Sequence, residues 1–204
     1  MMMQDGKPKA PQKALFTTRE LTIIGMLSGI TILLGITGYG LIPLPWMKMT
    51  VMHIPVIIGA LVAGPKPGAM IGLIFGIFSM VQAYMAPVIM SIALMNPLIS
   101  ILPRILIGLG AYYAYKVLIK STGKESVSLG IAGFIGSAIN TIGVMGGIYF
   151  LYAKEFALAR NISLDAVIDA ILSVCLINGL PEAVVSAIIT IPVVIALKRV
   201  ASKQ

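Results

Sequence analysis

The stretch from residue 49 to residue 84 carries a single charged side chain, Lys66, and this scarcity of charge constrains the fold most strongly. Two apolar arms, 51–64 and 68–84, flank the connection Gly-Pro-Lys-Pro-Gly. Proline cannot continue a helix and glycine adopts backbone angles that other residues resist, so the connection predicts a tight turn. Because water is a poor solvent for both arms, we expect a helical hairpin inside a lipid bilayer, with Lys66 where the turn emerges.

The composition of the whole chain predicts the same class of protein. Of its 204 residues only 11% are charged and 58% are hydrophobic, with a mean hydropathy of +1.01. A soluble domain averages about 25% charged residues. A membrane span needs about 20 apolar residues, so six helices would use most of this chain. We therefore expect an all-α integral membrane protein, a multi-pass bundle of six transmembrane helices without a second folded domain.

The boundaries follow from the alternation of apolar and polar segments. Helices are expected at about 19–37, 51–64, 68–84, 98–118, 127–151 and 166–197. The longer connections are expected to be loops at 39–50, 85–97 and 152–165. Residues 1–18 are predicted to be a disordered cytoplasmic tail, 19–198 the membrane domain and 199–204 a second cytoplasmic tail.

The distribution of Lys and Arg predicts the orientation in the membrane. With the N-terminus inside, eleven of the fifteen basic residues face the cytoplasm, and the four outside are Lys48, Arg104, Lys154 and Arg160. Cytoplasmic loops carry an excess of Lys and Arg, so both termini are expected in the cytoplasm. The net charge of +8 lies in loops and tails without a basic and aromatic stripe, so no nucleic-acid partner is expected.

Arg104 is the first candidate for a functional residue, because it lies in an otherwise apolar segment. A charge at the centre of a membrane costs about 2.5–3.5 kcal/mol on insertion scales, so it needs a partner or a watery cavity. One interpretation is a guanidinium that clamps a substrate carboxylate or phosphate. The alternatives are an arginine that reaches the outer headgroups or pairs with Glu182.

Other polar side chains in apolar segments are further candidates for ligand contacts. Asn178 and Glu182 lie four residues apart on one helical face, and Pro181 between them removes a backbone donor. They either contact a ligand or form a polar clasp between helices. Three polar residues are weaker candidates. Interhelical or local hydrogen bonds would also explain Asn140 and His53, and Asn96 lies in a loop beside the same pocket. The hairpin arms at 51–64 and 68–84 carry almost no chemistry, so they are expected to serve as scaffold.

Several absences narrow the function. The sequence has no Gly-x-x-x-x-Gly-Lys-Ser/Thr loop for a nucleotide and no paired His-x-x-His spacing for a metal. Glu182 is the only acid deep in an apolar segment, whereas an ion-coupled transporter usually has more. We expect no cofactor, no metal and no enzymatic activity, although a membrane-embedded enzyme or a structural subunit remains an alternative class.

Taken together, these segments resemble a known family. The run HIPVIIGALVAGPKPGAMIGLIFGIFS, the segments LPRILIGLGAYYAYK and NGLPEAVVSAIITIP, and a first helix with Gly25 and Gly29 are similar to the S components of energy-coupling factor (ECF) vitamin transporters. The similarity extends over nearly the whole chain from Arg19 onward.

The resemblance implies a subunit that captures a water-soluble vitamin from outside the cell. It would deliver the vitamin together with a transmembrane coupling protein and two cytoplasmic ABC-type ATPases, and Gly25 and Gly29 match the positions that meet the coupling protein. The substrate is expected against the later helices, in the region of Arg104, Asn140, Asn178 and Glu182.

The individual vitamin is a further expectation from the resemblance. The pattern from Met52 to Lys66, with the later Pro103 and Arg104, is most similar to the pantothenate branch, while riboflavin, folate and hydroxymethylpyrimidine are alternatives. A carboxylate ligand would be repelled by Glu182 unless that residue is paired or protonated.

Overall fold

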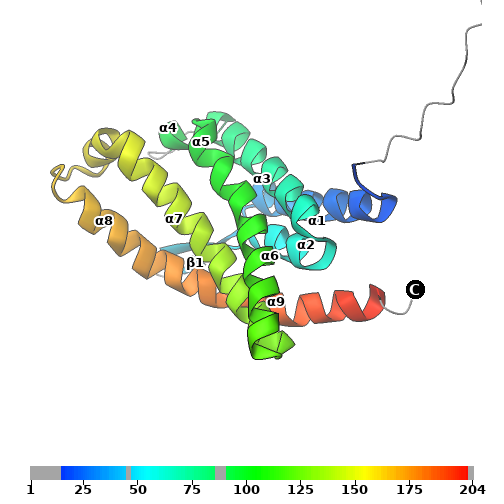
Figure 1. The fold of residues 1–204 in the computed structure, drawn as a ribbon. Helices are drawn as coiled ribbons and strands as arrows, with labels where there is room; N and C mark the ends of the chain where they lie inside the picture. The colour runs from blue at the N-terminus through cyan, green and yellow to red at the C-terminus, as the bar shows by residue number, and fades with distance from the viewer. Residues whose placement is uncertain (1–14, 45–46, 86–90, 202–204) are drawn as a thin grey trace, which may run out of the picture.

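The computed structural model describes residues 15–44, 47–85 and 91–201, which form a bundle of helices (Figure 1). The helices, in chain order, are α1 Thr18–Thr37, α2 Ile54–Ala63, α3 Pro65–Met85, α4 Ser91–Leu94, α5 Pro97–Ser100, α6 Leu102–Thr122, α7 Glu125–Arg160, α8 Val167–Val174 and α9 Leu180–Ala201. A π-helical turn, Cys175–Gly179, joins α8 directly to α9. The strands β1 (Leu41–Leu44) and β2 (Met47–Thr50) pair as an antiparallel hairpin between α1 and α2.

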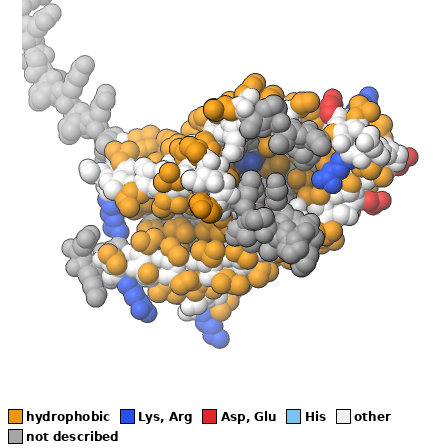
Figure 2. Space-filling view, turned by 180° about the vertical axis from the view of Figure 1, so that it is seen from behind, with side chains coloured by type: hydrophobic (Ala, Val, Ile, Leu, Met, Phe, Trp, Pro, Cys, Tyr) orange, Lys and Arg blue, Asp and Glu red, His pale blue; other side chains and the backbone are white. Residues whose placement is uncertain are grey.

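Five helical segments in the described part of the chain are long and apolar enough to cross a membrane. They are Thr18–Thr37, Pro65–Met85, Pro97–Thr122, Glu125–Arg160 and Val167–Val200. Large apolar side chains such as Phe150 and Ile188 are exposed, and hydrophobic side chains spread widely over the face in Figure 2. An apolar surface of this extent fits lipid and not water. The remaining expected helix, at 51–64, corresponds to α2, which is shorter than these five. Full-length spans therefore account for five of the six expected helices.

Helix α2 forms the centre of the bundle. Val56, Ile57 and Ala60 have no exposed surface, and the helix contacts α1, α3, α6 and α9. Its ten residues extend about 15 Å, about half of the 30 Å hydrocarbon core. A helix buried on every side and only half as long as its neighbours leaves space beyond its end.

The turn between α2 and α3 is tighter than predicted. Only Gly64, with φ 102°, separates the two helices, and α3 begins at Pro65. The prolines fit there because the first turn of a helix has no acceptor for their missing N–H groups. Gly68 is therefore helical, and its role is packing, since a Cβ at this position would overlap the Cβ of Ala60.

The three predicted loops contain more regular structure than expected. The segment 39–50 holds the β-hairpin, and 85–97 holds α4. The prediction of a loop at 152–165 was wrong as far as Arg160, which is helical. Helix α7 continues through Arg160 with a kink at Tyr152, because Phe156 and Ala157 pack with Val167 and Ile171 in a second apolar cluster.

The predicted tails are shorter than expected. Helix α1 begins at Thr18 with Thr17 as its N-cap, and α9 continues to Ala201, so 199–201 are helical. Residues 1–14 and 202–204 of the predicted tails lie outside the described residues.

The bundle has two distinct ends (Figure 1). The start of α1, the turn at Gly64, the α6–α7 connection and the end of α9 lie at one of them, here called the terminal end. The β-hairpin, α4, α5 and the α7–α8 connection lie at the other, here called the hairpin end. At the terminal end, Lys198 donates to Tyr115 (2.8 Å) and to Glu125 (3.0 Å), which joins α9, α6 and α7.

Candidate ligand-binding site

A cavity of about 470 Å³ lies at the hairpin end, beyond the start of α2. Ligand sites for small molecules typically have volumes of about 300–1,000 Å³. Its lining comes from most elements of the bundle, namely Gly35, Thr50, Met52, Phe75, Ser79, Gln82, Ala83, Ser91, Leu94, Arg104, Asn140, Thr141, Val144, Met145, Ile148, Val174, Asn178, Gly179 and Glu182. The space that the short α2 leaves open is thus a mostly apolar chamber with a few polar groups.

Arg104 lies on one wall of this cavity, in the first turn of α6, and only 7% of it is exposed. Its Nη1 donates to the carbonyl oxygen of Ile99 (2.9 Å), and its guanidinium lies 5.5 Å from the centroid of the Phe75 ring. Its Nε has no hydrogen-bond partner, and no carboxylate in the described part of the chain pairs with it. A buried guanidinium without a counter-charge favours an anion in the cavity.

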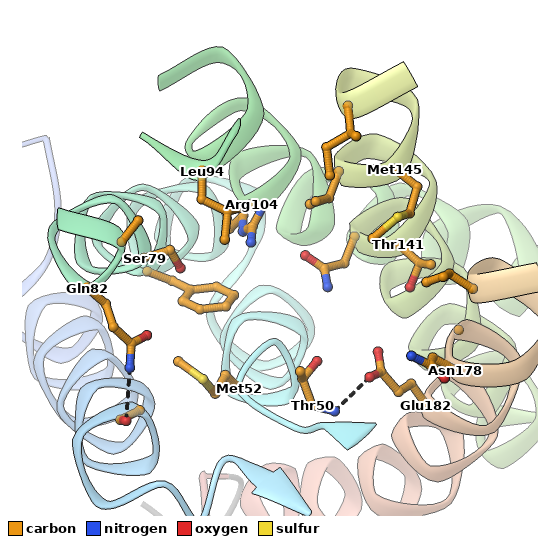
Figure 3. A pocket seen from close by; sticks show the side chains of 18 of the residues that line it. Thr50, Met52, Ser79, Gln82, Leu94, Arg104, Thr141, Met145, Asn178 and Glu182 are labelled. Carbon is orange, nitrogen blue, oxygen red and sulfur yellow. Dashed lines mark hydrogen bonds between the residues drawn. The ribbon is translucent and has the colours of Figure 1, made fainter. Parts of the chain in front are cut away.

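Glu182 lies on the opposite wall from Arg104, and both side chains face the cavity (Figure 3). The Glu182 carboxylate accepts a hydrogen bond from the backbone N–H of Thr50 (2.6 Å). The interpretation that Arg104 pairs with Glu182 is therefore wrong. The cavity instead separates a cation from an anion.

Asn178 stands beside Glu182, because the π-helical turn Cys175–Gly179 and α9 continue one helix (Figure 3). Such turns widen a helix by one residue and often occur at functional sites. The turn packs closely on α7, since a Cβ on Gly179 would lie 2.7 Å from Cγ2 of Thr141. Amide, hydroxyl and carboxylate groups from two helices therefore share this wall.

Asn140 is the fourth predicted residue in the cavity lining, and its Oδ1 is buried without a hydrogen-bond partner. Two other candidates lie outside the lining. His53 is 1% exposed, and neither ring nitrogen has a partner. Asn96 caps α5, where its Oδ1 accepts from the N–H of Leu98, and its Nδ2 donates to the hydroxyl of Tyr152 (3.3 Å).

The contribution of α3 to the cavity was not predicted from the sequence. The hairpin arm 68–84 was expected to be scaffold, yet Phe75, Ser79 and Gln82 line the cavity. The Nε2 of Gln82 also donates to the carbonyl oxygen of Gly35 in α1 (3.2 Å). A serine and a glutamine three residues apart in an otherwise apolar helix are a signal that would have indicated this wall.

Gly25 and Gly29 lie on an open side of α1. A Cβ added at either position would have no atom within 4 Å, so no neighbouring helix in the described structure covers them. The two glycines are available to a partner.

Membrane-spanning helices around a ligand-sized cavity with separated charges define a membrane protein that binds a small solute. The chain belongs to the family of ECF transporter substrate-specific components, which matches residues 19–194. Members of this family are transporter subunits and not enzymes, and the protein is a multi-pass protein of the cell membrane.

Two relatives carry more specific names. The chain is 29% identical over 171 residues to the "Pantothenic acid transporter PanT" of Lactococcus lactis subsp. cremoris, an alignment that covers 77% of this chain and 81% of the relative. It is 34% identical over 99 residues to the "Pantothenate transporter PanT" of Leuconostoc mesenteroides subsp. mesenteroides, and this alignment covers 47% of this chain and 48% of the relative. The family predicted from the sequence is therefore confirmed.

Proposed function

We propose that this S component captures pantothenate in the cavity between Arg104 and Glu182. The observation that carries the proposal is the buried Arg104 without a carboxylate partner in the described structure, in a cavity of about 470 Å³. The names of the two relatives indicate the same vitamin for those proteins.

The chemistry of pantothenate matches the two walls. The molecule has a carboxylate at one end, two hydroxyl groups near the other, an amide between them and a pair of methyl groups. Arg104 would bind the carboxylate, because a guanidinium forms strong charge-assisted hydrogen bonds with carboxylates. Glu182 and Asn178 would bind the hydroxyls and Asn140 the amide, while the apolar side chains Val144 and Met145 are suited to the methyl groups.

This orientation removes the conflict between two carboxylates. With the ligand carboxylate at Arg104, the carboxylate of Glu182 meets only hydroxyl donors, and it already accepts one backbone N–H from Thr50. The opposite orientation would place two negative charges together and leave the guanidinium without a partner, which costs free energy at both walls.

The proposal extends to the energising partners. The sequence has no P-loop, so ATP hydrolysis would come from the two ABC-type ATPases that the resemblance implies, with a separate transmembrane coupling protein between them and this chain. We assign the coupling-protein contact to Gly25 and Gly29, because small residues on an uncovered helix face allow another membrane helix to approach closely.

The orientation in the membrane follows from the position of the basic residues. Lys66, Lys120, Lys198 and Arg199 belong to segments at the terminal end, so we place that end and both termini in the cytoplasm. The hairpin end and the cavity then face the outside, where the vitamin is captured.

A ligand panel tests the proposed function. Purified protein in detergent, without ATP, is titrated by calorimetry with pantothenate, riboflavin, folate, biotin and thiamine. Binding of one pantothenate per chain, with no heat from the others, supports the proposal. Binding of a different vitamin would replace pantothenate, and no binding across the panel would overturn the vitamin assignment.

A further inference from the structure

A row of glycines on α3 lies directly against the backbone that carries Arg104. Gly68, Gly72 and Gly76 are spaced four residues apart, so they lie on one face of the helix. They meet a matching row on the antiparallel segment of α5 and α6 at Ser100, Arg104 and Gly108. We call these three α3 glycines the glycine seam.

The seam permits backbone contact at each step. A Cβ on Gly72 would overlap the carbonyl oxygen of Arg104, and a Cβ on Gly76 would lie 2.8 Å from the carbonyl oxygen of Ser100. One turn further along, a Cβ on Gly108 would lie 2.6 Å from the carbonyl carbon of Gly68. Atoms of a backbone cannot rotate away as a flexible side chain can, so any larger residue at Gly72 has to push the start of α6 outward.

The same helix also holds the guanidinium itself. Phe75, one turn from Gly72, places its ring 5.5 Å from the Arg104 guanidinium. The hydroxyl of Ser100 donates to the carbonyl oxygen of Gly76 (3.2 Å), which fixes the segment that presents the carbonyl of Ile99 to Arg104. The pose of the guanidinium therefore depends on α3 at three places.

We propose that the glycine seam and Phe75 position Arg104, so that they determine the preference of the cavity for a carboxylate over a neutral ligand. The proposal rests on the proposed function, since it concerns the residue assigned to the pantothenate carboxylate. Gly72 is the central element, because it meets the backbone of Arg104 itself. It is a positioning residue and needs no contact with the ligand.

The test compares pantothenate with panthenol, its neutral analogue in which a hydroxymethyl group replaces the carboxylate. Wild-type protein and Gly72→Ala are titrated with both ligands by calorimetry. A charge-assisted hydrogen bond that loses its geometry lowers affinity by roughly tenfold or more, so Gly72→Ala should bind pantothenate about tenfold more weakly. Its affinity for panthenol should stay within about twofold of wild type.

Two further variants make the result specific. Gly146→Ala adds the same methyl group at a glycine of α7 with no atom within 4 Å of its Cβ position, so both affinities should remain as in wild type. Phe75→Leu removes the ring but keeps an apolar side chain, and because Phe75 also lines the cavity, it should weaken both ligands, pantothenate by about tenfold more than panthenol. This variant decides the question if Gly72→Ala does not give a folded, monodisperse protein.

The outcomes separate the two proposals. Wild-type protein that binds neither ligand overturns the proposed function. A second outcome overturns only the positioning role. In it, the wild-type protein prefers pantothenate, and the Gly72→Ala and Phe75→Leu variants either keep this preference or lose affinity equally for both ligands.

Discussion

The carboxylate of Glu182 accepts a hydrogen bond from the backbone N–H of Thr50 over 2.6 Å, which ties α9 to the last residue of the β-hairpin. The two residues are 132 positions apart in the chain, and both line the cavity. Glu182 thus has a structural role at the site in addition to the ligand contact proposed for it.

This contact leads to a prediction for Glu182. Glu182→Ala removes the acceptor and leaves the Thr50 N–H without its partner, so pantothenate affinity should fall by about 1.5–3 kcal/mol. Glu182→Gln keeps an acceptor oxygen at the same position and should retain more of the affinity than the alanine variant. Calorimetry on both proteins measures the difference, and wild-type affinity in Glu182→Ala would contradict this role.

The central position of α2 leads to a prediction about stability. Ile57 has no exposed surface and lies against Gly136 of α7, so Ile57→Ala should lower the free energy of unfolding by about 2–5 kcal/mol. Ile188→Ala, at a side chain that is 62% exposed, is the matched control and should change stability far less. Thermal unfolding in one detergent compares the two, and equal shifts would argue against α2 as the core of the bundle.

The sequence predicted the class of fold well because apolar length is a local property. The five long helices are visible as apolar runs in the sequence. The burial of α2 on every side was not predictable, since it depends on which helices surround it. The extension of α7 beyond Tyr152 depends on Phe156 finding partners in α8, which a single segment does not reveal.

The site was predictable in part for the same reason. Arg104, Asn140, Asn178 and Glu182 are polar residues in apolar segments, so their residue types alone indicated them as candidates. The position of Arg104 and Glu182 on opposite walls required the packing of α6 and α9 around the cavity. Ser79 and Gln82 were overlooked because the apolar character of the hairpin arm outweighed two polar side chains within it.

The cluster at the terminal end leads to a prediction of a small effect. The side chains of Lys198 and its partner Glu125 are 32% and 49% exposed. Ion pairs that are open to solvent in this way contribute about 0–1 kcal/mol to the free energy of unfolding. Tyr115→Phe removes one acceptor of Lys198 and should lower the free energy of unfolding by less than about 1 kcal/mol. Thermal unfolding at low and high salt measures it. A larger loss that salt does not reduce would show that the cluster is shielded from solvent.

The uncovered glycines of α1 lead to a prediction that separates capture from transport. Gly25→Leu with Gly29→Leu should leave pantothenate binding unchanged, because neither glycine lines the cavity. Uptake of radiolabelled pantothenate by cells with the complete transporter should be lost, since bulky residues prevent close helix packing. Met26→Leu, at an exposed neighbour on the same helix, is the control and should transport normally. Normal uptake in the double variant would exclude this surface as the coupling contact.

The most direct test of the account is the effect of Arg104→Ala on pantothenate binding, measured by calorimetry without ATP. The account predicts that wild-type protein binds one pantothenate per chain. The Arg104→Ala variant should be at least as thermally stable as wild type, yet its binding free energy for pantothenate should be weaker by about 1.5–3 kcal/mol. Unchanged pantothenate affinity in a folded Arg104→Ala protein would contradict the central claim that this guanidinium holds the carboxylate of the vitamin.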